Sequence, residues 1–275
     1  MNRSGNKWAL LAISLVFAVI YLFPLYWMYI TSVKSQSEVF ATPPTFWPHS
    51  TDFGIYATVW VRRAVPSYMW NSLVIASGVT AITVFLGTGL AYVLARHRNI
   101  WIDVGLFAVL MLQVLPASVM VTPLFVAFNQ LGLLEWPRTA VILGASAKAM
   151  PFFVVLVRAT FMTVPRELEE AALVDGNSRP GAFFSIVLPL ARNGVLVCAI
   201  LTFMSAFGEY VYAKSIIQEP GLQPASVGLQ SFLGPNTKDW NSIMAYSAMY
   251  VTPILGLFVL LQRRIVSGLT SGALK

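Results

Sequence analysis

The sequence predicts an all-α membrane protein with six transmembrane helices. Of its 275 residues, 57% are hydrophobic and only 11% are charged, whereas a soluble protein has about 25% charged residues. The mean hydropathy is +0.71. So few charges could not cover the surface of a soluble protein of this size, so the excess apolar residues must face lipid. This composition excludes a cytosolic enzyme, a nucleic-acid-binding domain and a disulfide-built secreted domain.

Six apolar segments account for the predicted spans, because a bilayer core about 30 Å thick requires about 20 helical residues. The expected spans are 8–33, 70–95, 104–130, 139–161, 193–213 and 242–262. The first is too long for the apolar region of a signal peptide, so we expect it to be retained. No large soluble domain lies between the spans, and residues 1–275 are therefore expected to form a single membrane domain.

Some residues within the spans carry further expectations. Five prolines are expected to kink or interrupt helices: Pro24, Pro116, Pro123, Pro151 and Pro253. Gly87 and Gly89, in the second span, indicate close helix packing.

The distribution of basic residues predicts the orientation. With six spans both termini lie on one side, together with residues 96–103 and 162–192. These segments hold more Lys and Arg than the opposite set, 34–69, 131–138 and 214–239. Because basic residues are enriched in cytoplasmic segments, both termini are expected in the cytoplasm.

The cytoplasmic segment 162–192 has dense helix signals. Thr163 is suited to cap a first helix, and Gly176 to end it in the left-handed conformation. Ser178 is suited to cap a second helix, which we expect to end at Pro189, before the fifth span. The segment is therefore predicted to form two short helices.

The first loop helix is predicted to dock a protein. Ala171 and Ala172 lie on one side of it with Leu168, at i, i+3 and i+4, and their small side chains permit close approach of a partner. The alternative is a helix lying on the lipid headgroups, but such helices favour Lys and Arg, and this one is acidic.

The loop resembles the EAA loop of ABC importer permeases. The match runs Glu170-Ala171-Ala172, Gly176, Ile186 and Leu188-Pro189, with the family's spacing. Further stretches are similar to the carbohydrate-uptake branch, of maltose type. They are Phe23-Pro24-Leu25-Tyr26-Trp27, Thr31-Ser32-Val33-Lys34, Asn71-Ser72-Leu73, Leu131-Gly132-Leu133 and the tail from Gly268 to Lys275.

The resemblance implies a type I importer-like subunit that is not itself an enzyme. Its partners would be a second permease subunit, two cytoplasmic ATPases that bind ATP and Mg²⁺, and an extracytoplasmic binding protein that delivers a sugar. This chain would need no cofactor, and it contains no phosphate-binding Gly-x-x-x-x-Gly-Lys-Ser/Thr loop. The location would be the cytoplasmic membrane of a bacterium or archaeon.

Two sets of residues are expected to meet the ATPases. The residues of the coupling loop are Leu168, Glu170, Ala171, Ala172, Asp175, Gly176 and Pro189. Those of the tail are Gly268, Gly272 and Lys275.

The sequence also departs from the family pattern. Asn193 and Gly194 stand where members often have a second proline, and Phe207-Gly208-Glu209-Tyr210 replaces a Trp-Asn pair followed by an acidic and an aromatic residue. The second departure leaves the substrate chemistry of that segment open.

Charged residues within spans require a reason, because exposing them to lipid is unfavourable. Lys148 is expected about 13–14 Å below the outer end of span four, and Glu209 about 6 Å below that of span five, at 1.5 Å per residue. With Tyr210, they are candidates for the transport path. The alternative is that Lys148 reaches a carbonyl or a partner residue.

The same sequence is also compatible with other functions. An importer for glycerol phosphate or another polyol would use this subunit type. An ion-coupled secondary transporter should show inverted repeats or several buried carboxylates. His49 and His97 lack the neighbours of a metal site or a catalytic triad.

Overall fold

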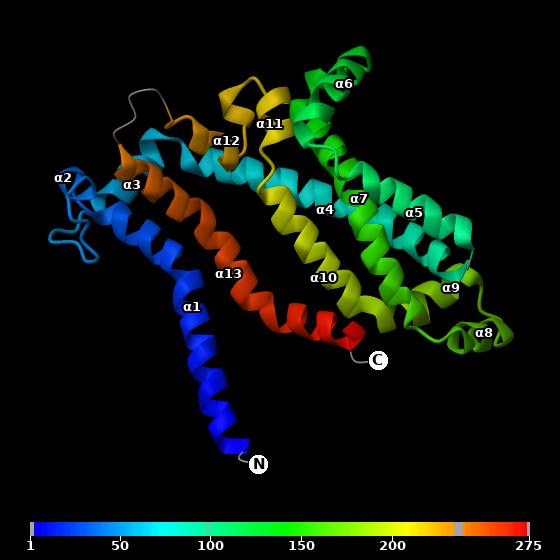
Figure 1. The fold of residues 1–275 in the computed structure, drawn as a ribbon. Coiled ribbons are helices and arrows are strands. Elements are labelled where there is room, and N and C mark those ends of the chain that lie inside the picture. Colours follow the sequence, from blue (N-terminus) through cyan, green and yellow to red (C-terminus); the bar gives the residue numbers. More distant parts are fainter. Residues whose placement is uncertain (1–2, 98, 234–238, 274–275) are drawn as a thin grey trace. The chain divides into compact units, whose positions relative to one another are not determined.

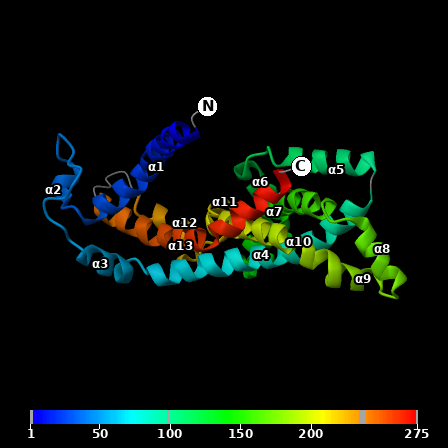
Figure 2. The same cartoon turned by 90° about the horizontal axis from the view of Figure 1, so that it is seen from below.

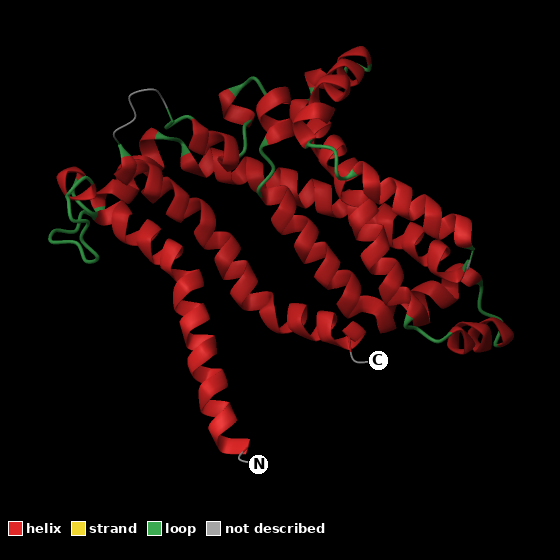
Figure 3. Ribbon diagram, viewed as in Figure 1, coloured by secondary structure: helices red, strands yellow, loops and turns green. Residues whose placement is uncertain are grey.

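The computed structural model of the chain describes residues 3–97, 99–233 and 239–273, and all regular structure in these ranges is helical (Figures 1 and 3). Within them, five helices are long and apolar enough to cross a membrane: Lys7–Val33, Val65–Arg96, Pro137–Met162, Arg179–Phe207 and Trp240–Arg264. Ile100–Leu112 and Ala117–Gln130 would be a sixth if the pair is one span, and they are bent by 96° at their junction. The chain is a multi-pass helical membrane protein.

The contacts divide the chain into two compact units, where a single domain was expected. One comprises residues 1–66 and 228–253, and the other 67–227 and 254–275. The three divisions fall within helices α4 (Val65–Arg96), α12 (Ala225–Gln230) and α13 (Trp240–Ala273).

The first unit contains α1 (Arg3–Val33), α2 (Gln36–Val39), α3 (Gly54–Arg62) and the first part of α13. Polar contacts tie α1 to α13. The Tyr29 hydroxyl lies 2.7 Å from Thr252 Oγ1, and the Asn241 amide donates to the carbonyl oxygens of Thr31 and Lys34.

Glu38 holds together the segment that follows α1 through hydrogen bonds. Its carboxylate accepts bonds from Thr45 Oγ1 at 2.6 Å and from the His49 backbone N–H at 3.1 Å. These bonds favour the charged form of the carboxylate, that with Thr45 most strongly, and they lower the pKa of Glu38 below its ordinary value. Lys34 is buried beside this segment and donates to the Thr45 carbonyl.

The second unit contains most of α4 and the elements that follow it. They are α5 (Ile100–Leu112), α6 (Ala117–Gln130), the 3₁₀ turn η1 (Leu133–Glu135), α7 (Pro137–Met162), α8 (Arg166–Val174), α9 (Arg179–Ala182), the π-helix η2 (Phe183–Val187), α10 (Leu188–Phe207), α11 (Val211–Ile216), the 3₁₀ turn η3 (Pro220–Leu222) and the first part of α12. Helices α7 and α10 lie side by side in Figures 1 and 2.

The core of this unit joins α4, α7, η2 and α10. Its centre is apolar, with Phe153, Val157, Phe161 and Val187 almost fully buried. A Cβ added at Gly87 would lie 2.6 Å from Phe153 Cδ1, whereas one at Gly89 would meet nothing within 4 Å. Only Gly87 therefore serves the close packing that both glycines led us to expect.

Gly194 accounts for one departure from the family pattern. A Cβ at this position would lie 2.4 Å from Thr160 Cγ2, because α10 approaches α7 closely there. A proline or any other residue with a Cβ would require the Thr160 side chain or the helices to shift.

Two predicted spans differ from the structure. Residues 104–130 do not form one helix, because the backbone breaks between α5 and α6 at Pro116, which has no N–H to donate. Residues 193–213 are also divided, since α10 ends at Phe207 and α11 begins at Val211. The other four prolines that were expected to kink or interrupt helices lie inside helices: Pro24, Pro123, Pro151 and Pro253.

Candidate functional site

Helix α8 carries the first candidate surface, and its ends follow from the sequence. Glu167 and Glu169 lie in the first turn, where they favour the positive end of the helix dipole. At the other end Gly176 has φ +88°, which a residue with a Cβ rarely adopts. The N–H groups of Gly176 and Asn177 donate to the carbonyls of Leu173 and Ala172, so the helix ends in a Schellman motif.

Most of the predicted coupling residues come together beside this helix. Leu168, Ala171, Ala172, Asp175 and Gly176 line one shallow groove. The groove is completed by two residues that were not among the candidates, Asn177 and Ile186. Ala172 forms its buried floor, while Ala171, Asp175 and Gly176 are exposed. The buried part of the groove is therefore the small side chain of Ala172, and Leu168 and Ile186 supply its larger apolar side chains.

The two remaining loop candidates lie outside the groove lining. Glu170 is exposed on α8, where its carboxylate is accessible. Pro189 lies in the first turn of α10. The expectation that Pro189 ends a second loop helix is wrong, since α9, η2 and α10 follow one another without a break in the helical backbone.

The π-helix explains why Pro189 is tolerated there. The Leu188 N–H donates to the Phe183 carbonyl five residues earlier, and this wider turn reduces the clash of the proline ring with the preceding turn. Ser178 caps the start of this helix as predicted, accepting from the Gly181 N–H at 3.1 Å. Thr163 was expected to cap α8 but instead follows the end of α7, where its hydroxyl donates to the Thr160 carbonyl.

A residue that the sequence reasoning did not single out connects α8 to the rest of the unit. This residue is Glu169, in the first turn of α8. In the structure its carboxylate accepts bonds from Arg96 and Tyr92, both near the end of α4. No local pattern indicated this contact, because Arg96 and Glu169 lie 73 positions apart. Arg166, three residues before Glu169, also contacts Arg96.

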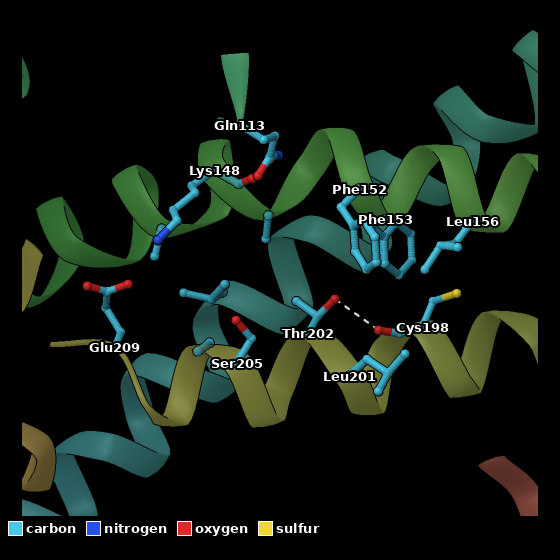
Figure 4. A pocket seen from close by; sticks show the side chains of 14 residues that line it. Gln113, Lys148, Phe152, Phe153, Leu156, Cys198, Leu201, Thr202, Ser205 and Glu209 are labelled. Carbon is cyan, nitrogen blue, oxygen red and sulfur yellow. Dashed lines mark hydrogen bonds between the residues drawn. The ribbon is translucent and has the colours of Figure 1, made fainter. Parts of the chain in front are cut away.

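A cavity in the second unit contains the second candidate group. Its volume is about 180 Å³, and its wall includes Lys148 of α7 and Glu209 just after α10. Figure 4 shows these two side chains pointing toward one another across the cavity. Tyr210, the third candidate, is not part of the wall.

Glu209 and Lys148 differ in how they are held. Glu209 is 9% exposed, and its Oε1 accepts the Tyr212 N–H at 2.9 Å, which caps the start of α11. The Lys148 side chain is exposed, and its Nζ lies 5.6 Å from the centre of the Tyr212 ring. The ion pairs among the described residues do not include Lys148 with Glu209.

Gln113 belongs to the same cavity and was not predicted. It follows α5 at the break before Pro116, and its Nε2 donates to the Lys148 carbonyl at 2.6 Å. Pro151 lacks the N–H that would donate to the carbonyl four residues earlier, that of Ala147. The bond from Gln113 to the adjacent Lys148 carbonyl was therefore not indicated by the proline.

The rest of the cavity wall is mixed. Thr202 and Ser205 of α10 supply hydroxyl groups, and the Thr202 hydroxyl donates to the Cys198 carbonyl at 2.9 Å (Figure 4). Phe152, Phe153 and Leu156 form an apolar portion. The cavity thus places hydrogen-bonding groups of both kinds and an apolar wall around one space, which suits an amphipathic solute with hydroxyl groups.

The tail candidates are described only in part. The backbone of Gly268 and Gly272 continues α13, and Lys275 lies outside the described residues. Among the described residues there is no group of three or more His, Cys, Asp or Glu side chains arranged to hold a metal ion.

Comparison with known proteins identifies the family. The model of the family described as "Binding-protein-dependent transport system inner membrane component" matches residues 84–267 of this chain. The sulfoquinovosyl glycerol transport system permease protein SmoH of Agrobacterium fabrum is 33% identical over 255 residues, covering 92% of this chain and 89% of SmoH. The trehalose transport system permease protein SugB of Mycobacterium tuberculosis is 32% identical over 276 residues, covering 99% and 98%.

A solved structure shares the fold. The crystal structure of a bacterial ABC transporter involved in the import of the acidic polysaccharide alginate includes a chain that matches with a TM-score of 0.77 at 20% identity, covering 96% of this chain and 98% of that one. The protein described here therefore belongs to the family of binding-protein-dependent transport system inner membrane components.

Proposed function

We propose that this chain is a permease subunit of an ATP-driven, binding-protein-dependent importer, and that it forms half of the path for a sugar or oligosaccharide. Family membership and the names of relatives that transport trehalose and sulfoquinovosyl glycerol support this function. The proposal replaces the secondary-transporter alternative, because the family match covers most of the chain.

The groove beside α8 is the observation that carries the proposed mechanism. Its small floor and exposed rim allow another protein to approach the backbone closely, and Glu170 stands beside it as an accessible charge. We assign this surface to a cytoplasmic ATPase subunit. ATP and Mg²⁺ bind in the ATPase subunits, and this chain contributes no catalytic group or cofactor.

In this mechanism, ATP binding closes the ATPase dimer and displaces α8. The displacement changes the balance between inward-open and outward-open arrangements of the spans. The two tail glycines, Gly268 and Gly272, with Lys275, are assigned to a secondary contact with the ATPases.

The remaining partners follow from the same assignment. The cavity of about 180 Å³ is smaller than the roughly 300–1,000 Å³ of sites that enclose a small ligand. A second permease subunit would supply the rest of the wall, and an extracytoplasmic binding protein would deliver the cargo. The location is the cytoplasmic membrane of a bacterium or archaeon, with both termini in the cytoplasm.

Lys148 and Glu209 are assigned to the cavity part of the path, and Tyr210 to its border. A second cargo class is an anionic sugar or a polyol phosphate. The Lys148 ammonium favours it, since it reaches the cavity wall without forming an ion pair with Glu209. Uptake assays that compare a neutral disaccharide with glycerol phosphate in cells expressing the complete transporter distinguish the two classes.

Docking is tested with a matched pair of variants on α8. Ala171→Arg places a long charged side chain in the groove, whereas Val174→Arg places it at an exposed position outside the groove. We expect Ala171→Arg to abolish copurification of the ATPases while the chain still inserts, and Val174→Arg to retain them. Glu170→Lys is expected to weaken the same contact. ATPase binding by Ala171→Arg at the wild-type level would remove α8 from the contact.

A further inference from the structure

We propose that Glu169 is a positioning residue that fixes α8 to the cytoplasmic end of α4, so that the two helices move as one body. This inference rests on the proposed docking of an ATPase on α8, and it assigns to Glu169 a role different from that of its neighbour Glu170.

The contact has two branches and little access to water. Arg96 Nε donates to Glu169 Oε2 at 2.7 Å, and the Tyr92 hydroxyl donates to Glu169 Oε1. The side chains of Arg96 and Glu169 are each 12% exposed. Exposed ion pairs restrain their partners weakly because water and salt screen them, but a shielded pair with hydrogen bonds on both carboxylate oxygens holds a defined geometry.

Arg96 extends the contact to a third helix. Its Nη1 lies 3.3 Å from the carbonyl oxygens of Phe161 and Val164, at and just after the end of α7. In the other direction, Arg166 Nη2 donates to the Arg96 carbonyl at 2.8 Å. Arg166 and Glu169 of α8 thus both contact Arg96 of α4. Two contact points restrain the rotation of α8 relative to α4 as well as the distance between the two helices.

The exposures of the two adjacent carboxylates support a division of roles. Glu170 is exposed, and its carboxylate is accessible to a partner. Glu169 faces the protein and is occupied by Arg96 and Tyr92. A displacement imposed on α8 from outside is therefore passed to α4 and α7 at Arg96, rather than being absorbed by the segments that flank α8.

The test measures whether α8 and α4 move together in the assembled transporter. Spin labels are attached at Val93→Cys on α4 and Val174→Cys on α8, both exposed positions, with Cys198→Ala in every variant. Pulsed electron paramagnetic resonance gives the distance distribution between the labels, without nucleotide and with Mg·ATP. Copurification of the ATPases is measured for each variant.

With Glu169 intact, we expect one distance distribution that ATP does not change. In Glu169→Gln, ATP should shift or broaden it while the ATPases remain bound. Arg96→Gln should have the same effect, and the double variant should be no worse than either single variant, because both remove one interaction. Asp103→Asn is the matched control: it breaks the Arg158–Asp103 pair, 2.6 Å long, which joins α5 to α7 without α8.

Two results would overturn the proposal. One is a Glu169→Gln distribution that remains unchanged with ATP. The other is loss of the ATPases from Glu169→Gln, which would place Glu169 in the ATPase contact itself. Failure of the underlying docking proposal is recognised separately, by Ala171→Arg retaining its ATPases.

Discussion

Replacing Gly87 by Ala tests the close packing of α4 against α7, and Gly89 supplies its control on the same helix. Carbon atoms normally pack at about 3.5–4.0 Å, whereas the new Cβ at position 87 would lie 2.6 Å from Phe153 Cδ1 and 3.1 Å from Met150 Sδ. Phe153 is 1% exposed, so its ring has little room to withdraw. About 1 Å of movement is therefore required of the ring or the helices.

The expected magnitude follows from two opposing effects. Overpacking of a buried contact is unfavourable by about 1–3 kcal/mol. Replacing Gly by Ala within a helix is favourable by roughly 0.5–1 kcal/mol. Both variants gain the second effect, but only Gly87→Ala incurs the first. The difference between them should therefore be about 1–3 kcal/mol, or about 2–12 °C in Tm for a chain of this size.

Thermal unfolding of the purified transporter in detergent, with both variants at equal concentration, measures this difference. The double variant Gly87→Ala/Phe153→Leu adds a second criterion, because Phe153→Leu should be less unfavourable when position 87 carries alanine than when it carries glycine. Equal Tm values for the two alanine variants, or strictly additive effects in the double variant, would show that the contact does not limit the packing of α4.

Three further predictions concern separate parts of the chain. Gly176→Val should destabilise the end of α8 by about 1–2 kcal/mol, because φ is +88°, and proteolysis of the loop should increase; unchanged cleavage would contradict this. Lys148→Met should reduce uptake with the complex intact, and wild-type uptake would exclude this ammonium from the path. The pKa of Glu38 is lowered by its bonds to Thr45 and His49, so their stabilising effect is complete above its unfolded value of about 4.5 and is lost as the pH falls through the folded pKa. As the pH falls, pepsin cleavage within 40–53 should therefore increase more steeply in the wild type than in Glu38→Gln. The same pH dependence in both proteins would argue against this linkage.

The helical membrane class could be predicted because it depends on the hydrophobic composition and on the length of the apolar segments, and both can be read from the sequence. Uninterrupted apolar length places residues 8–33, 70–95, 139–161 and 242–262 within single helices. Two of the three predicted caps of the loop, Ser178 and Gly176, are confirmed because they act through local backbone geometry, whereas Thr163 does not cap α8.

The breaks and the partners of charged side chains could not be predicted in the same way. Pro116 lies at a break in the backbone, whereas Pro123 and Pro151 lie inside helices, and the sequence around each proline does not distinguish these outcomes. The bond from Gln113 to the Lys148 carbonyl joins residues 35 positions apart. The contact between Arg96 and Glu169 spans 73 positions. Local patterns carry no information about such distant pairs.

Because Glu209 caps α11, the two charged side chains that line the cavity differ in conformational freedom. Its Oε1 is held by the Tyr212 N–H, so the carboxylate is already fixed in position before a hydroxyl donor reaches it. This arrangement avoids the roughly 0.5–1.5 kcal/mol of ordering that a free side chain loses on binding. If the proposed path is correct, Lys148, whose side chain is exposed, keeps that freedom until a solute binds. Glu209 would then select the position of a hydroxyl group, and Lys148 would accommodate solutes of different length.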